Sequence, residues 1–231
     1  MEKLSNIKAL TFDLFGTILD LGGSLTPFIA AFLESKESDA SAAHFWKQWR
    51  ARQRLEQYQD TIMMLGHCGY QEAARRAFVY TLGLNDIQAS SAEVQNFMRA
   101  WQELSPFPDV LPALERLTSR YQLAVLSNGE PDFLEYLASH RVQWEFDNII
   151  SVELVGAFKP HPGVYRRAVG ELGLEAGECL MVSANSFDVV GAKACGMGGA
   201  FVNRYGLPYE DTPYLPDLTV QNFTELATAL L

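Results

Sequence analysis

Polar residues at the ends of apolar runs are the feature of this sequence that most restricts its fold. Five strand-like runs cover residues 9–12, 123–126, 149–152, 180–182 and 199–202, and Asp13, Ser127 and Ser183 follow three of them. Because the runs are continuous rather than alternating, they are typical of parallel strands buried on both faces. The carboxyl ends of such strands meet at one edge of the sheet, where ligands bind. We therefore expect these three side chains to converge.

Helical patterns separate the runs, and Leu111, Leu114 and Leu117, for example, share one helical face. Alternation of strand and helix predicts an α/β fold with a doubly wound, Rossmann-like parallel sheet. Residues 21–105 interrupt this alternation because they contain no strand-like run. Apolar residues there recur at helical spacing in two series, Phe45, Trp49, Leu55, Tyr58, Ile62, Leu65 and Val94, Phe97, Met98, Trp101, Leu104. A candidate capping box, Ser90 with Glu93, precedes the second series.

The charge balance limits the possible partners. The chain has 18 basic and 28 acidic residues, a net charge of -10, whereas nucleic acids and anionic membranes usually need a basic face, so we exclude both as partners. No apolar run approaches the roughly 20 residues of a membrane span, and no secretory segment precedes the first strand, so we expect a cytoplasmic protein. Cys68, Cys179 and Cys195 lack metal or disulfide spacing.

A lysine is predicted at the same edge of the sheet. Lys159 lies between the third run and the next helical segment. An ammonium group beside Asp13 favours the charged carboxylate, so Asp13 is a candidate nucleophile rather than an acid. Gly16 permits a tight turn after Asp13, and backbone N–H groups in such a turn are suited to bind an anionic group of the substrate.

Four segments resemble, in order and spacing, the motifs of the haloacid dehalogenase (HAD-like hydrolase) superfamily. They are residues 12–18, 126–129, 158–160 and 182–188. The resemblance covers the whole α/β core. It implies an HAD-type core formed by residues 1–20 and 106–231, with residues 21–105 inserted as a helical cap domain.

Two positions separate the phosphatases of this superfamily from its dehalogenases. Phosphatases carry an acid where this chain has Phe15, and another where it has Ala184. Losing a carboxylate ligand weakens Mg²⁺ binding, and a halide leaving group needs no proton. The chain further resembles the L-2-haloacid dehalogenase subfamily at residues 127–129 and 183–188, at Lys159-Pro160, at Tyr165 and at Asn203-Arg204. The resemblance implies an enzyme that needs no metal and no cofactor.

The resemblance also implies a mechanism. Asp13 displaces halide from a short L-2-haloalkanoic acid with inversion, and water hydrolyses the resulting aspartyl ester to a D-2-hydroxy acid. Lys159 would stabilise the negative charge. Asp188, with Ser183 and Asn185, would orient or activate the water. Thr17 and Tyr165 would support the Asp13 and Lys159 side chains, respectively.

Other residues are assigned to the substrate by their motif positions. The proposed substrate-binding set is Leu14, Phe15, Ser127 and Asn128. The proposed halide-binding set is Arg50, Asn128 and Phe187. Arg50 stands in a Trp-Arg-x-x-Gln context in the cap, at residues 49–53. Many members of the subfamily have tyrosine at the position of Phe15 and a second serine at that of Ala184, so these departures affect the expected pocket size and halide preference.

Two alternative functions remain open at this point. A Mg²⁺-dependent phosphatase would need acids in place of Phe15 and Ala184. A catalytically silent binding protein on the same scaffold would not need Asp13, Lys159 and Asp188 together. The resemblance and the apolar-rich cap also suggest a homodimer.

Overall fold

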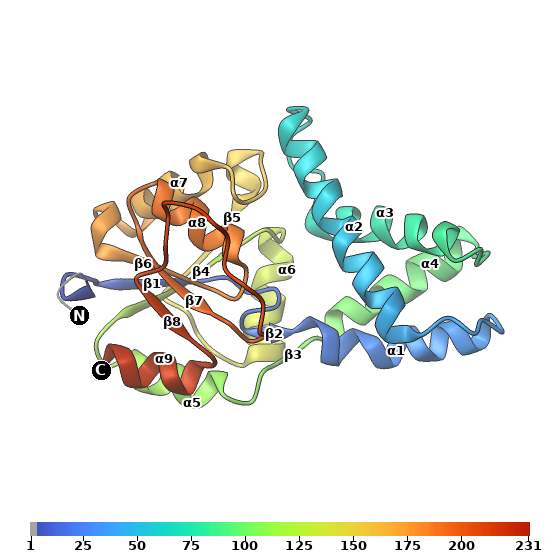
Figure 1. The fold of residues 1–231 in the computed structure, drawn as a ribbon, viewed down its shortest axis with the longest axis horizontal. Helices are drawn as coiled ribbons and strands as arrows, with labels where there is room; N and C mark the ends of the chain where they lie inside the picture. Colours follow the sequence, from blue (N-terminus) through green and yellow to red (C-terminus); the bar gives the residue numbers. More distant parts are fainter. Residues whose placement is uncertain (1–3) are drawn as a thin grey trace. The chain divides into compact units, whose positions relative to one another are not determined.

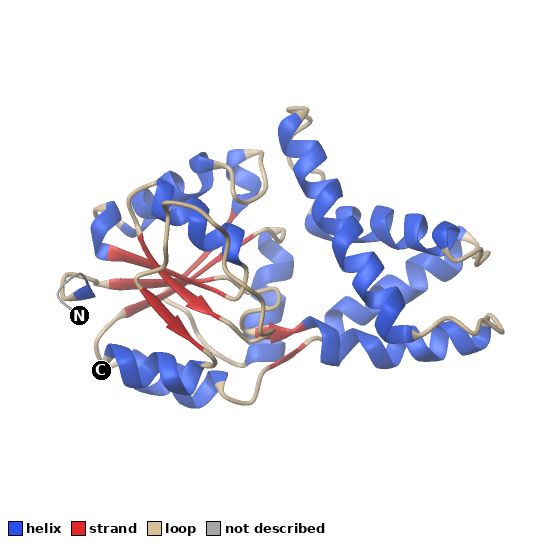
Figure 2. Ribbon diagram, in the orientation of Figure 1, coloured by secondary structure: helices blue, strands red, loops and turns tan. Residues whose placement is uncertain are grey.

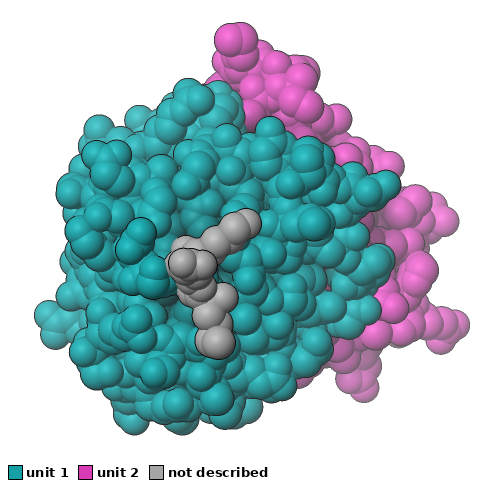
Figure 3. Space-filling model, turned by 60° about the vertical axis from the view of Figure 1, so that its left-hand side comes forward, with its two compact units in different colours: residues 1–19, 106–231 teal, residues 20–105 magenta. Residues whose placement is uncertain are grey.

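The computed structural model describes residues 4–231, and this part of the chain divides into two compact units. Unit 1 comprises the chain up to Leu19 together with Pro106–Leu231, and unit 2 comprises Asp20–Ser105. Figure 3 shows the two units in different colours. Two short strands, β2 (Leu19–Asp20) and β3 (Ser105–Pro106), pair where the chain passes from one unit to the other.

Unit 1 is built on a parallel sheet whose order, within residues 4–231, is β5-β4-β1-β6-β7-β8. The strands are β1 (Ala9–Phe12), β4 (Gln122–Ser127), β5 (Asn148–Ser151), β6 (Cys179–Ser183), β7 (Gly198–Val202) and β8 (Leu218–Val220). Every residue of β1 and β6 is buried, which explains their continuous apolar runs. The predicted α/β fold class is confirmed. The sequence did not indicate β8, which lies at one edge of the sheet.

Helices cover both faces of this sheet. α5 (Val110–Leu117) and α9 (Phe223–Leu230) lie together on one face, and α7 (Pro162–Leu172) and α8 (Ser186–Ala194) lie on the other (Figures 1 and 2). A further helix, α6 (Pro131–Tyr136), follows β4 and continues into a π-helical turn at Leu137–Val142. Phe12 of β1 stacks on Phe223 of α9 at 5.6 Å between ring centroids, which ties the central strand to this helical layer.

Unit 2 is helical, with α1 (Leu21–Ser35), α2 (Ala42–Ile62), α3 (Tyr70–Leu84) and α4 (Ser91–Met98), followed by a 3-10 turn at Arg99–Glu103. Its core is aromatic: Trp49 contacts the rings of Phe78, Phe97 and Trp101. The predicted capping box is present, because the side chain of Ser90 and that of Glu93 each accept a hydrogen bond from the other residue's backbone N–H. No helix within residues 4–231 is both long enough and apolar enough to cross a membrane.

The second half of α2 buries polar rather than apolar side chains. Leu55 and Ile62, and Leu65 just after the helix, continue the helical spacing of the buried Phe45 and Trp49, but they are 51%, 79% and 66% exposed. The buried face carries polar side chains instead, Gln53, Glu56, Gln57 and Asp60. These carboxylates are paired, since Arg76 of α3 lies 2.6 Å from Asp60 and Arg52 lies 2.6 Å from Glu56. Helical spacing gave the element correctly but not the face that is buried.

Candidate active site

The carboxyl edge of the central strands positions Asp13. Phe12 pairs with Val125 of β4 and Val182 of β6, so Asp13 leaves β1 between two neighbouring strands. Its backbone N–H donates to the carbonyl oxygen of Val182 at 3.0 Å. The residue is only 6% exposed, so its carboxylate depends on nearby donors rather than on bulk water.

The two oxygens of Asp13 have different surroundings. Oδ2 accepts hydrogen bonds from Thr17 Oγ1 and Asn185 Nδ2, both at 2.8 Å, and a longer one from Ser183 Oγ at 3.5 Å. Thr17 Oγ1 in turn accepts from the backbone N–H of Ala184 at 2.9 Å. Oδ1 faces Lys159 Nζ at 3.5 Å. The carboxylate is therefore held through one oxygen, while the other has the looser contact.

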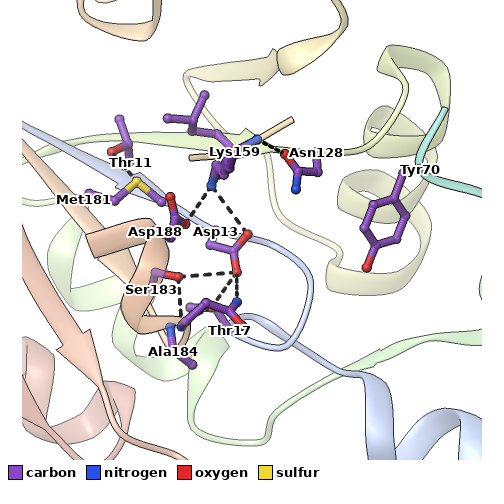
Figure 4. Close-up of polar contacts among 12 residues, drawn as sticks. Thr11, Asp13, Thr17, Tyr70, Asn128, Lys159, Met181, Ser183, Ala184 and Asp188 are labelled. Atoms are coloured by element: carbon purple, nitrogen blue, oxygen red, sulfur yellow. Dashed lines mark hydrogen bonds and ion pairs between the residues drawn. The ribbon is translucent and has the colours of Figure 1, made fainter. Parts of the chain in front are cut away.

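Lys159 is buried between two carboxylates (Figure 4). Its Nζ donates to Asp188 Oδ2 at 2.8 Å, to the carbonyl oxygen of Leu126 at 2.6 Å and to Asp13 at 3.5 Å. Its backbone N–H donates to Asn128 Oδ1 at 2.8 Å. A buried ammonium needs such partners, and here they fix its position beside the nucleophile candidate.

Asp188, in the first turn of α8, is fully buried, and Oδ1 accepts a hydrogen bond from Tyr165 OH at 2.8 Å. Burial raises the pKa of Asp188, although the charge of Lys159 opposes this shift. Burial and the charge of Asp188 raise the pKa of Tyr165 well above its ordinary value, so the phenol stays a donor. Tyr165 thus supports Asp188, whereas the resemblance had suggested Lys159 as its partner.

The residues around Asp188 do not fit a divalent cation. Both of its oxygens accept from protein donors, Lys159 and Tyr165, and the neighbouring motif position is the methyl side chain of Ala184. Within residues 4–231 no group of three or more His, Cys, Asp or Glu side chains is arranged to hold a metal ion. Hard cations such as Mg²⁺ need several oxygen ligands.

Ser127 ends β4, and its hydroxyl group differs from those of Thr17 and Ser183 because it is buried without a partner in the described part of the chain. The residue is 0% exposed, and its Oγ has no hydrogen-bond partner among residues 4–231. Burying an unpaired hydroxyl is unfavourable, so such a group in a native fold calls for a specific reason. A ligand that accepts a hydrogen bond at this position would supply one.

Apolar side chains lie beside these polar groups. Leu14 and Phe15 are buried, and Phe15 stacks on Phe133 with 6.1 Å between ring centroids. A Cβ atom at Gly129 would lie 2.6 Å from the Leu134 side chain and 3.1 Å from the Phe15 ring, so the glycine makes room for both. Phe187 is half-buried in the first turn of α8.

Arg50 belongs to α2 of unit 2. Its guanidinium donates to Gln53 Oε1 at 3.0 Å and to Tyr70 OH at 3.2 Å, and both partners are buried. These contacts hold Arg50 within its own unit. Its role as a halide ligand stays a prediction.

The structure brings most of the predicted residues of unit 1 into one hydrogen-bonded group, and it adds contacts that the sequence did not indicate. One is the Leu126 carbonyl oxygen at Lys159. Another is Tyr205, whose OH donates to the carbonyl oxygen of Gly16 at 2.9 Å. Backbone acceptors carry no residue-type signal, so spacing does not reveal them.

Comparison with known protein families identifies the family of this chain. Residues 7–196 match the family model of haloacid dehalogenase-like hydrolases. The chain belongs to this family. The earlier resemblance is thereby confirmed, and with it the expectation of a hydrolase of the haloacid dehalogenase type.

Its relatives within the family include dehalogenases. The chain is 32% identical to haloacetate dehalogenase H-2 of Moraxella sp. (strain B), over 94% of this chain and 95% of that protein. It is 30% identical to (S)-2-haloacid dehalogenase H-109 of Pseudomonas putida, over 97% and 98%. A structure of L-2-haloacid dehalogenase from Xanthobacter autotrophicus with chloropropionic acid covalently bound matches 97% of this chain, with 98% of its own length covered, a TM-score of 0.83 and 27% identity.

Proposed function

We propose that this haloacid dehalogenase-like hydrolase is an (S)-2-haloacid dehalogenase. It hydrolyses the carbon–halogen bond of short L-2-haloalkanoic acids to D-2-hydroxy acids and halide. The observation that carries the proposal is the asymmetric Asp13 carboxylate, held through Oδ2 by Thr17 and Asn185 with Oδ1 left to the looser Lys159 contact. A nucleophilic carboxylate needs one oxygen fixed and the other available.

In the first step, Asp13 Oδ1 attacks the α-carbon of the substrate from the side opposite to the halogen. A new C–O bond forms, the carbon–halogen bond breaks, and the halide leaves with the bonding electrons. The α-carbon is inverted and an ester joins it to Asp13. The main contribution of the protein to this step is positioning, which is worth up to roughly 7–11 kcal/mol in well-oriented systems.

In the second step, water attacks the carboxyl carbon of the ester and loses a proton. Asp188 is our candidate for accepting this proton, with Ser183 and Asn185 orienting the water. Burial raises the pKa of Asp188, which makes its carboxylate a stronger base. Lys159, 2.8 Å from Asp188, stabilises the negative charge that develops on the ester oxygen. As the bond between the carboxyl carbon and the ester oxygen breaks, Asp188 returns the proton to the leaving alkoxide, which departs as the D-2-hydroxy acid. The carboxyl group of Asp13 loses its own proton to solvent, which restores the carboxylate.

The proposed substrate contacts follow from unpaired and apolar groups. Ser127 Oγ, buried without a partner among residues 4–231, donates to the substrate carboxylate together with N–H groups of the Asp13 turn. Leu14 and Phe15 contact the carbon chain. The halide is received by Asn128, Phe187 and Arg50, with unit 2 acting as the cap domain that supplies Arg50.

We also propose that the reaction needs no metal ion. The ammonium group of Lys159 already lies within contact of both carboxylates, Asp13 and Asp188. It supplies the positive charge that a cation would otherwise provide to these carboxylates.

The direct test is halide release from L- and D-2-chloropropionate, each with and without EDTA. We expect chloride from the L-isomer only, at the same rate in both conditions, with D-lactate as the organic product. No release from the L-isomer, or complete loss with EDTA, contradicts the proposal. Turnover of small phosphate esters only with Mg²⁺ would instead support a phosphatase.

Finally, we propose a homodimer that uses the exposed apolar residues at the end of α2 and directly after it, Ile62, Met63, Met64 and Leu65, which are 57–86% exposed. Light scattering on the protein as it elutes from a size-exclusion column measures its mass directly. Met64→Glu, which places a charge on this surface, is expected to shift a dimer to the 25.8 kDa monomer. Phe28→Glu, at an apolar residue of α1 that is 41% exposed, is the control and leaves the mass unchanged.

A further inference from the structure

The loop after β7 reaches back to the turn that follows the nucleophile. Arg204 Nε donates to the carbonyl oxygen of Thr17 at 2.9 Å, and Tyr205 OH donates to that of Gly16 at 2.9 Å. Two consecutive side chains therefore hold two consecutive carbonyl groups, although 187 and 189 positions separate the partners in sequence. Neither side chain belongs to the catalytic group assigned above.

Arg204 is itself held rigidly. Its guanidinium forms a bidentate pair with Asp109 at 3.0 and 2.9 Å, and its centre lies 4.0 Å from the centroid of the Phe107 ring. The side chain is only 7% exposed. An arginine in a planar fork with an aromatic ring on its face is preorganised, so it can define the position of a third partner.

The turn that these residues hold determines the orientation of Asp13. Thr17 contacts Asp13 through its hydroxyl at 2.8 Å while its carbonyl oxygen accepts from Arg204. Gly16 has a φ of 88°, a conformation that glycine reaches easily and leaves easily. A turn with this freedom needs external contacts to keep one geometry, and its carbonyl groups receive them.

We propose that Arg204 and Tyr205 are positioning residues for the nucleophile, acting through the backbone of Gly16 and Thr17. The proposal rests on the function of Asp13 given above. It requires that loss of either contact slows formation of the aspartyl ester, because the attacking oxygen is displaced, while substrate binding at Ser127 is retained. The expected signature is a lower kcat with KM nearly unchanged.

The first test compares two tyrosine hydroxyls of the same loop. Tyr205→Phe removes the contact with Gly16, and the matched control Tyr209→Phe removes a hydroxyl that donates to the carbonyl oxygen of Tyr214 at 3.1 Å. The rate of ester formation on Asp13 is measured in single-turnover experiments followed by mass spectrometry. We expect this rate to fall roughly tenfold in Tyr205→Phe, since a misplacement of 1 Å can lower a rate about 100-fold. Tyr209→Phe keeps the original rate.

The second test uses Arg204→Ala and Arg204→Lys with added guanidinium ion. We expect both variants to form ester at least about tenfold more slowly, and guanidinium to restore part of the rate in Arg204→Ala. Thermal unfolding identifies a temperature at which each variant is folded, so a general loss of structure is separated from misplacement.

Ester formation at the original rate in folded Tyr205→Phe and Arg204→Lys overturns the proposal. An equal loss in Tyr209→Phe also overturns it, because the effect then belongs to the loop as a whole. Failure of the proposed function looks different: the unmodified protein then forms no ester on Asp13 with any haloacid.

Discussion

At the scale of single residues, the polar groups of the site differ in whether they already have hydrogen-bond partners. Asp13 Oδ2, Lys159 and Asp188 all have partners within hydrogen-bond distance, so they form a fixed frame before any ligand is present. Ser127 Oγ has none among residues 4–231. We therefore propose that the frame contributes to reactivity and the unpaired hydroxyl to substrate binding.

Ser127→Ala tests this separation. Removing an unpaired hydroxyl costs the folded protein nothing, so we expect the free energy of unfolding to stay the same or rise slightly. Loss of a hydrogen bond to the charged substrate is worth roughly 1.5–3 kcal/mol, so kcat/KM should fall about 10- to 100-fold, mainly through KM. Urea unfolding and steady-state halide release measure the two quantities.

The neighbouring serine is the matched control for stability. Ser151, paired in register with Ser127, donates its hydroxyl to the carbonyl oxygen of Gly129 at 2.6 Å. Ser151→Ala breaks a formed hydrogen bond and should lower the free energy of unfolding by about 1 kcal/mol. If Ser127→Ala destabilises the protein by as much, its hydroxyl is paired in solution and the assignment fails.

The sequence predicted which residues converge but not every partner within the group. Asp13, Ser127 and Ser183 follow from strand order because parallel strands share an edge. The Tyr165–Asp188 contact depends on Gly191, which lies one turn after Asp188 in the same helix, α8. A Cβ atom at Gly191 would lie 2.6 Å from Tyr165 OH. The space for the Tyr165 hydroxyl is a property of three-dimensional packing, which the spacing of residues in the sequence does not predict.

At the scale of elements, apolar runs located five strands within a residue or two of their ends. The sixth, β8, was not predicted because it is short and its middle residue, Thr219, is exposed. On α2 the helix was predicted, but the buried polar face was not, because its carboxylates are compensated by Arg52 and by Arg76 of α3. Hydrophobic periodicity identifies a buried face only where burial is apolar.

Asp109 connects three elements of the core and gives the protein a pH-dependent contact. It precedes α5, pairs with Arg204 after β7, and accepts from the backbone N–H of Phe223 at the start of α9 at 2.7 Å. Burial acts to raise the pKa of Asp109, but the hydrogen bonds from Arg204 and Phe223 outweigh it, and the pKa is lowered.

We therefore expect Asp109→Asn to show a pH-dependent loss of stability. Because the folded-state pKa is depressed, the stabilisation is fully present above the unfolded-state value near pH 3.9 and is lost as the pH falls through the lower folded-state pKa. At pH 7 the variant should be less stable by about 1–3 kcal/mol, and the difference should shrink below about pH 4. Urea unfolding at pH 7 and pH 3 decides; an equal difference at both values contradicts the assignment.

At the scale of the whole molecule, charge and function oppose each other. The net charge of -10 repels an anionic substrate, and its leaving halide is an anion as well. We therefore propose that the attraction is local, from Lys159, Ser127 and the amides of the Asp13 turn. Long-range repulsion is screened by salt, with a Debye length of about 10 Å at 0.1 M, whereas buried contacts are screened much less.

The consequence is an activity that rises with ionic strength. Between about 0.02 and 0.2 M salt we expect kcat/KM for L-2-chloropropionate to increase roughly two- to threefold, with kcat nearly unchanged. Steady-state kinetics in salts of two different anions separates screening from competition at the halide site. A decrease that is the same in both salts would show that an attractive field, rather than a repulsive one, reaches the substrate.

The central position of β1 in the sheet also has a consequence for folding. Both strands that pair with it, β4 and β6, begin after residue 120, so a chain growing from its N-terminus holds β1 with two unsatisfied edges while all of Asp20–Ser105 is made. Unit 2 is continuous in sequence and meets no such delay. Asp13 is thus synthesised well before its surroundings, which are completed only when Arg204 and its partners emerge, and until then the unpaired edges of β1 are open to mispairing.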